Sequence, residues 1–134
     1  MQVRKVTFHF LVACGLLNLC GMSVALGQTQ TDMTKAADRD AQKVEQRLDA
    51  AINKYRKRLD KTQLRDFDES QRLWVAYRKS ACDFEAGGDD GGSVQPMIIL
   101  ECFQRYAAVR LMDVQRLLTC TEGDLSCPVF SDGT

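Results

Sequence analysis

The chain has 134 residues, with 18 basic and 18 acidic side chains, one histidine and six cysteines. This length fits one domain, or one domain behind a processed leader, and excludes a multidomain protein. The apolar fraction of 45% argues against wholesale disorder, and the zero net charge excludes a generally basic nucleic-acid binder.

The first 27 residues have the pattern of a secretory signal peptide. Arg4 and Lys5 give a basic start, a nearly uninterrupted apolar run covers residues 6–26, and Ala25-Leu26-Gly27 supplies small residues for cleavage. We therefore expect residues 1–27 to be removed on export. Two alternatives rank below cleavage. The run is long enough to be a retained membrane anchor, and residues 11–14 resemble the lipobox of a lipoprotein.

Removal of this leader changes the charge and the number of cysteines. About 107 residues remain, with 16 basic and 18 acidic side chains, a net charge of −2, four cysteines and no histidine. Four cysteines in an exported protein predict two disulfides, because the compartment is oxidising. The predicted location is the periplasm or the medium, with membrane association only if the leader is retained or lipidated.

Three helical segments follow the leader. Residues 31–61 lack Gly and Pro and place apolar side chains at steps of three and four, with Thr31 or Asp32 as the expected N-cap. Residues 62–85 form the second segment, and the break before it is either a tight turn or a kink. The third segment runs from an N-cap at Ser93 to about Leu118.

No strand-like alternation occurs, so the predicted fold class is all-α. We expect a small domain of about three helices in antiparallel, hairpin-like packing over residues 28–119. Residues 120–134 would form a disulfide-closed loop and a C-terminal tail.

The segment between the second and third helices is acidic and rich in glycine, and it is the best candidate for a partner-binding surface. Glu85, Asp89, Asp90 and Ser93 lie in it or beside it. Loops carry function disproportionately, and flexible glycines allow a carboxylate to enter a partner's groove. A plain solvated connector is an equally good interpretation.

The four remaining cysteines are predicted to form two structural disulfides. A Cys82–Cys102 bond would staple the second helix to the third, and a Cys120–Cys127 bond would close a short C-terminal loop. Four cysteines allow three pairings, and only proximity in sequence favours this one. Zinc binding is disfavoured, because the cysteines form no close ligand pairs and the only histidine, His9, lies in the leader.

No constellation for catalysis follows the leader. Without a histidine, a triad with a histidine base is excluded. The glycine-rich segment has no preceding strand, and its two aspartates would repel a phosphate, so it is not a phosphate-binding loop. We therefore predict a binding protein, not an enzyme, with no catalytic residue, no cofactor, no metal and no nucleic-acid partner.

Four residues on the helical stripes are assigned structural roles: Trp74, Tyr77, Arg78 and Arg110. Trp74 and Tyr77 each bring a large apolar area with one polar group. Arg78 and Arg110 lie among apolar residues. Each is expected to bury its stem and to reach a carboxylate or a helix-end carbonyl rather than a ligand.

These residues together resemble the LprI-type lysozyme inhibitor N-terminal domain family. The resemblance covers residues 29–118, and its most specific part is the run Gln71-x-x-Trp74-x-x-Tyr77-Arg78-x-x-x-Cys82, followed by Gly91-Gly92-Ser93, Cys102 and Arg110. The chain departs from the family pattern at Ala36, Ile52 and Ala107, where cysteine, tyrosine and threonine are common. A bridge usual in the family therefore cannot form, which leaves Cys82–Cys102 as the best supported bond.

The resemblance implies a small, helical, exported, disulfide-bearing protein that binds a protein partner. For some family members it implies inhibition of lysozyme, a cationic enzyme that cleaves peptidoglycan. The expected function is steric occlusion of such an enzyme, with Glu85, Asp89 and Asp90 attracting the basic partner. The alternative is an envelope adaptor, or an immunity protein against a secreted cell-wall toxin, without lysozyme binding.

Overall fold

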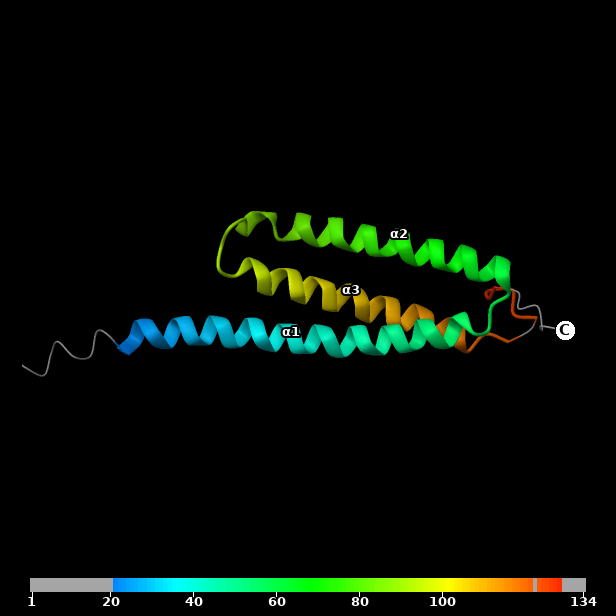
Figure 1. Ribbon diagram of the computed structural model, residues 1–134, viewed down its shortest axis with the longest axis horizontal. Helices are drawn as coiled ribbons and strands as arrows, with labels where there is room; N and C mark the ends of the chain where they lie inside the picture. Colours follow the sequence, from blue (N-terminus) through cyan, green and yellow to red (C-terminus); the bar gives the residue numbers. More distant parts are fainter. Residues whose placement is uncertain (1–20, 122, 129–134) are drawn as a thin grey trace, which may run out of the picture.

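A computed structural model describes the backbone of residues 21–121 and 123–128, and the side chains from residue 29 onwards. The described chain forms three long helices, α1 (Gly21–Arg56), α2 (Lys61–Glu85) and α3 (Gln95–Leu118), and a short 3-10 turn, η1 (Gly87–Asp89) (Figure 1). These described residues contain no strand. The predicted all-α fold of about three helices is confirmed.

The helices α1 and α3 form the closest pair, and they run in the same direction. Figure 1 shows α2 running antiparallel to both of them. α3 packs far more extensively against α1 than against α2. Small buried side chains, among them Ala41 and Ala51 on α1 and Ala107 on α3, allow this close approach.

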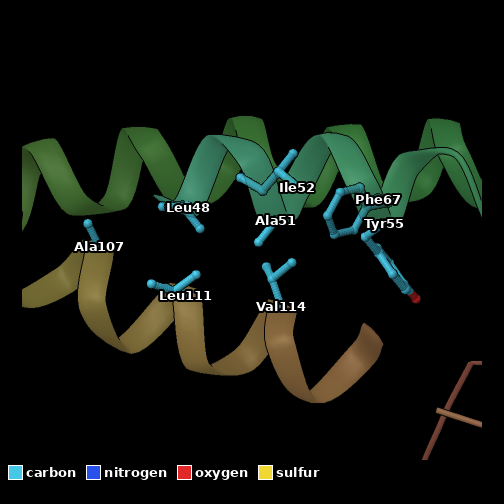
Figure 2. Close-up of a cluster of buried hydrophobic side chains, with 8 residues drawn as sticks. All are labelled: Leu48, Ala51, Ile52, Tyr55, Phe67, Ala107, Leu111 and Val114. Atoms are coloured by element: carbon cyan, nitrogen blue, oxygen red, sulfur yellow. The ribbon is translucent and has the colours of Figure 1, made fainter. Parts of the chain in front are cut away.

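The apolar core joins the C-terminal half of α1 to the C-terminal half of α3, with one large contribution from α2. Figure 2 shows Leu48 and Ala51 pointing toward Leu111 and Val114. Tyr55 and Phe67 complete this core with an edge-to-face contact, their ring centroids 5.0 Å apart. Burial of each large side chain contributes about 1.5–3 kcal/mol, so this cluster supplies much of the stability of the fold.

The connection between α1 and α2 is a tight turn rather than a kink. Asp60 is the N-cap of α2, and its carboxylate accepts hydrogen bonds at 2.8 Å from the backbone N–H groups of Thr62 and Gln63. The side chain of Gln63 accepts a bond at 3.2 Å from the backbone N–H of Asp60, which completes a capping box. This reciprocal cap begins a new helix without any Gly or Pro.

The predicted starts of the first and third helices are wrong. α1 begins at Gly21, so Thr31 and Asp32 lie inside it, because nothing between residues 28 and 34 interrupts a helix. Val94, not Ser93, precedes α3, and it makes no side-chain cap hydrogen bond. The Gln95 side chain accepts a bond from the Gly91 N–H at 3.2 Å instead.

Both predicted disulfides are present. Cys82 joins Cys102 and ties the end of α2 to the first turns of α3, and both residues are fully buried. Cys120 joins Cys127 just after α3. The Arg58 guanidinium donates to the carbonyls of Leu118 and Cys120 at 2.5 and 3.1 Å. These bonds hold the connection between α1 and α2 against the C-terminal end of α3.

The predicted leader falls almost entirely outside the described residues, and of residues 1–27 only the backbone from Gly21 is described. Among the helices that are described, none combines the length and the apolar character needed to span a bilayer.

Candidate functional site

The acidic residues proposed for partner binding lie at the end of the molecule where α2 turns into α3. Glu85, at the end of α2, forms an ion pair with Arg105 of α3. Asp90 accepts a hydrogen bond from the Gln95 side chain at 3.3 Å. Asp89 and Ser93 are exposed. The loop therefore presents Asp89 and Asp90 outward, while the Glu85 carboxylate already has a partner within the fold.

This loop is more ordered than its glycine content suggests. The Gly92 N–H donates to the Asp89 carbonyl at 2.7 Å, and Gly91 adopts a φ of +74°, a left-handed conformation that favours glycine. A Cβ on Gly92 would lie 2.9 Å from the Asp89 carbonyl oxygen, so this position is also restricted to glycine. The two glycines shape a defined turn that holds the aspartates at the tip.

Arg78 lies between two aromatic rings and pairs with a carboxylate of another helix. Its guanidinium carbon is 4.5 Å from the centroid of Trp74 and 5.0 Å from that of Phe103. The side chain is 13% exposed and forms an ion pair with Glu45 of α1. One residue of α2 therefore contacts both other helices, through cation–π contacts and a charge-assisted bond.

Arg110 of α3 also contacts Trp74, with its guanidinium carbon 5.8 Å from the ring centroid. It donates to the Gln71 side-chain oxygen at 3.3 Å and to the Ser70 hydroxyl at 3.5 Å. Burial lowers the pKa of Arg110. Within the described part of the chain it meets an amide and a hydroxyl and forms no ion pair, unlike the carboxylate or helix-end carbonyl expected from the sequence.

Tyr77 is more exposed than its assigned structural role suggests, at 61% of its surface. Its ring nevertheless makes an edge-to-face contact with Tyr106 of α3, with the centroids 5.8 Å apart. Tyr77 therefore connects α2 to α3 at the surface, whereas Trp74 is half-buried and packs against the apolar core.

A shallow groove of about 340 Å³ lies between α1 and the first half of α3. Its apolar floor comes from Ala41, Leu100 and Phe103, and its acidic side chains are Asp38 and Asp49, together with the Glu45 that pairs with Arg78. Gln42 and Gln46 also line the groove.

Sequence reasoning missed this groove. A signal for half of it was present, because Asp38, Glu45 and Asp49 are spaced by seven and four residues and so share one face of a helix. The floor was not foreseeable, since it depends on the parallel pairing of α1 with α3.

The site has the chemistry of a binding surface. In the residues that the structure describes, no three His, Cys, Asp or Glu side chains are grouped so as to hold a metal ion. The described carboxylates near the groove and the loop serve as ion-pair partners, hydrogen-bond acceptors or exposed charges. Exposed carboxylates beside an apolar floor fit recognition of a basic protein surface.

Comparisons with known proteins identify a family for this chain. A family model described as "Lysozyme inhibitor LprI" matches residues 20–113, which contain all of α1 and α2 and most of α3. An uncharacterized protein of Rhizobium meliloti (strain 1021) is 28% identical over 54 residues, which cover 40% of this chain and 39% of that protein. No solved structure matches. The family match covers most of the chain, which therefore belongs to the LprI lysozyme inhibitor family.

Proposed function

We propose that this protein inhibits a cationic, peptidoglycan-cleaving enzyme of the lysozyme type by covering its substrate cleft. The observation that carries the proposal is the family match over residues 20–113, a range that includes the acidic loop and the helices beside it. The two disulfides fit a protein that acts outside the cytoplasm.

The electrostatics of the loop support a basic target. Asp89 and Asp90 are exposed at the tip of the α2–α3 connection, where their charges are not offset by ion pairs within the described chain. A net charge of −2 for residues 28–134 gives only weak long-range attraction, so local carboxylates must provide most of the steering. Glu85 contributes less, because Arg105 already neutralises it.

The test uses the oxidised protein from residue 28 onwards in a cell-wall lysis assay with a cationic lysozyme. We expect the protein to slow lysis, and Asp89→Asn with Asp90→Asn to lower the association rate and its salt dependence. The matched control replaces two exposed acids at the far end of the bundle, Asp66→Asn with Asp113→Asn, and should leave the association rate near that of the parent protein.

Two outcomes would contradict the proposal at different levels. Unchanged association after removal of the two loop aspartates would refute the loop mechanism while leaving inhibition intact. Failure of the parent protein to bind or inhibit lysozyme at micromolar concentration would refute inhibition itself. The result would then favour an envelope adaptor or an immunity protein directed at a different cell-wall enzyme.

A further inference from the structure

The groove between α1 and α3 combines an apolar floor with acid on its rim, and every charged residue that lines it is acidic. Such a surface suits the side chains of lysine and arginine, which carry a long aliphatic stem and a terminal charge. We propose that this groove docks a basic segment of the cationic partner protein. The identity of that partner rests on the proposed function, whereas the affinity of the groove for a basic segment follows from its own residues.

The carboxylates of the groove differ in their availability. Glu45 is already neutralised by Arg78, and Asp38 accepts a hydrogen bond at 2.8 Å from the neutral Gln42 amide. Asp49 is exposed and forms no ion pair with any described residue. The negative charge that remains to be matched therefore belongs to Asp38 and Asp49.

The dimensions of the groove indicate a segment rather than a single side chain. Asp38 and Asp49 are about 16 Å apart along α1, at 1.5 Å of rise per residue. One guanidinium cannot reach both carboxylates. The arrangement fits two basic side chains of one segment, with their heads at Asp38 and Asp49 and their stems over Leu100 and Phe103.

The groove lies near the acidic loop, so one partner can contact both. Leu100 follows the start of α3 by about 8 Å, and α3 begins just after the loop. A standard interface covers about 800 Å² on each partner, which is large enough to include the loop tip and the groove. The groove would then add apolar contact and residence time, while the loop adds attraction at long range.

The binding test compares two groove variants with a control on the same helix. Asp38→Asn with Asp49→Asn removes the unmatched charges and retains side-chain size. Gln46→Lys places a cation between them at an exposed position. The control, Asp32→Asn with Asp40→Asn, makes the same change of charge on exposed parts of α1 that do not line the groove.

Affinity for a cationic lysozyme is measured by titration calorimetry at moderate salt. We expect Asp38→Asn with Asp49→Asn to bind roughly tenfold more weakly, as loss of two exposed ion pairs predicts. Gln46→Lys should also weaken binding, because its cation repels the basic segment, and the control should bind within about twofold of the parent. Equal binding by parent and groove variants overturns the groove inference and leaves inhibition standing.

If the parent does not bind lysozyme, a second measurement tests directly whether the groove binds a basic segment. An oligo-arginine peptide is added to isotope-labelled protein, with an oligo-glutamate peptide as the control. Shifts in the amide signals of Gln42, Gln46 and Leu100 with the basic peptide alone support a site for basic segments. No shifts at these positions overturn it, whatever the target of the protein proves to be.

Discussion

The Arg78 stack offers the sharpest test of how this small fold is held together. Replacing Arg78 with Met keeps an aliphatic side chain of similar reach and removes the charge. The substitution leaves the Glu45 carboxylate, which is 32% exposed, without its ion-pair partner. It also ends the cation–π contacts with Trp74 at 4.5 Å and Phe103 at 5.0 Å.

The size of the effect follows from these contacts. A charge-assisted bond in a partly solvated position contributes about 1.5 kcal/mol, near the lower end of its usual range. Each cation–π contact adds about 0.5–1 kcal/mol at such a site. We therefore expect Arg78→Met to lower the free energy of unfolding by about 3 kcal/mol, which corresponds to a fall of about 2 M in the urea midpoint for a chain of this size.

Urea unfolding is followed by circular dichroism and by the fluorescence of Trp74, the only tryptophan of the chain. Glu45→Gln and the double variant complete a thermodynamic cycle that isolates the ion pair from the aromatic contacts. A loss below about 0.5 kcal/mol in Arg78→Met would refute the reasoning, because the stack would then be no stronger than an ordinary surface ion pair. If the whole loss of stability appears as the coupling energy between Arg78 and Glu45 in this cycle, the ion pair alone accounts for the effect and the aromatic contacts contribute nothing.

Three further predictions concern the covalent and local bonds. Replacing both Cys82 and Cys102 with alanine removes their disulfide. This should lower the free energy of unfolding, measured in urea, by about 3 kcal/mol, because the unfolded chain regains the entropy of the loop that the bond closes. Asp60→Ala should lower the free energy of unfolding by about 1 kcal/mol, because α2 loses its N-cap. Asp60→Asn should lower it much less, since asparagine also caps helices, and thermal unfolding of the two variants measures the difference. Hydrogen bonds from Ser126 lower the pKa of Asp124, so the stabilisation from this carboxylate is present above its ordinary pKa and is lost as the pH falls through the lowered value. Ser126→Ala should raise the Asp124 pKa in an NMR titration, and an unchanged pKa would disprove this cause.

Local patterns predicted most of the secondary structure correctly. The steps of three and four along residues 31–61 mark a stripe that is buried in the fold, because helix periodicity directly sets which side chains face the core. Proximity in sequence was sufficient to pair the cysteines. The helix starts were harder, because Ser93 is a good cap by type, whereas the Gln95 side chain bonds to the loop instead.

The candidate site was less accessible to sequence reasoning. The acidic loop is visible in composition, but the pairing of Glu85 with Arg105 depends on two helices coming together. The groove needed one more fact, the parallel pairing of α1 with α3, which are separated along the chain by the whole of α2. No local pattern encodes which of two neighbouring helices packs more closely.

That parallel pairing also affects how the chain reaches its native state. Leu48 and Leu111 meet in the core although they lie about 60 residues apart, so their contact requires closure of a long loop. The Cys82–Cys102 bond shortens the effective path between them to about 45 residues, which favours closure roughly 1.7-fold. Oxidation before docking of α1 therefore gives only a modest gain in folding rate. The main kinetic benefit of the bond should be slower unfolding, because α2 and α3 cannot separate at the loop end once they are joined.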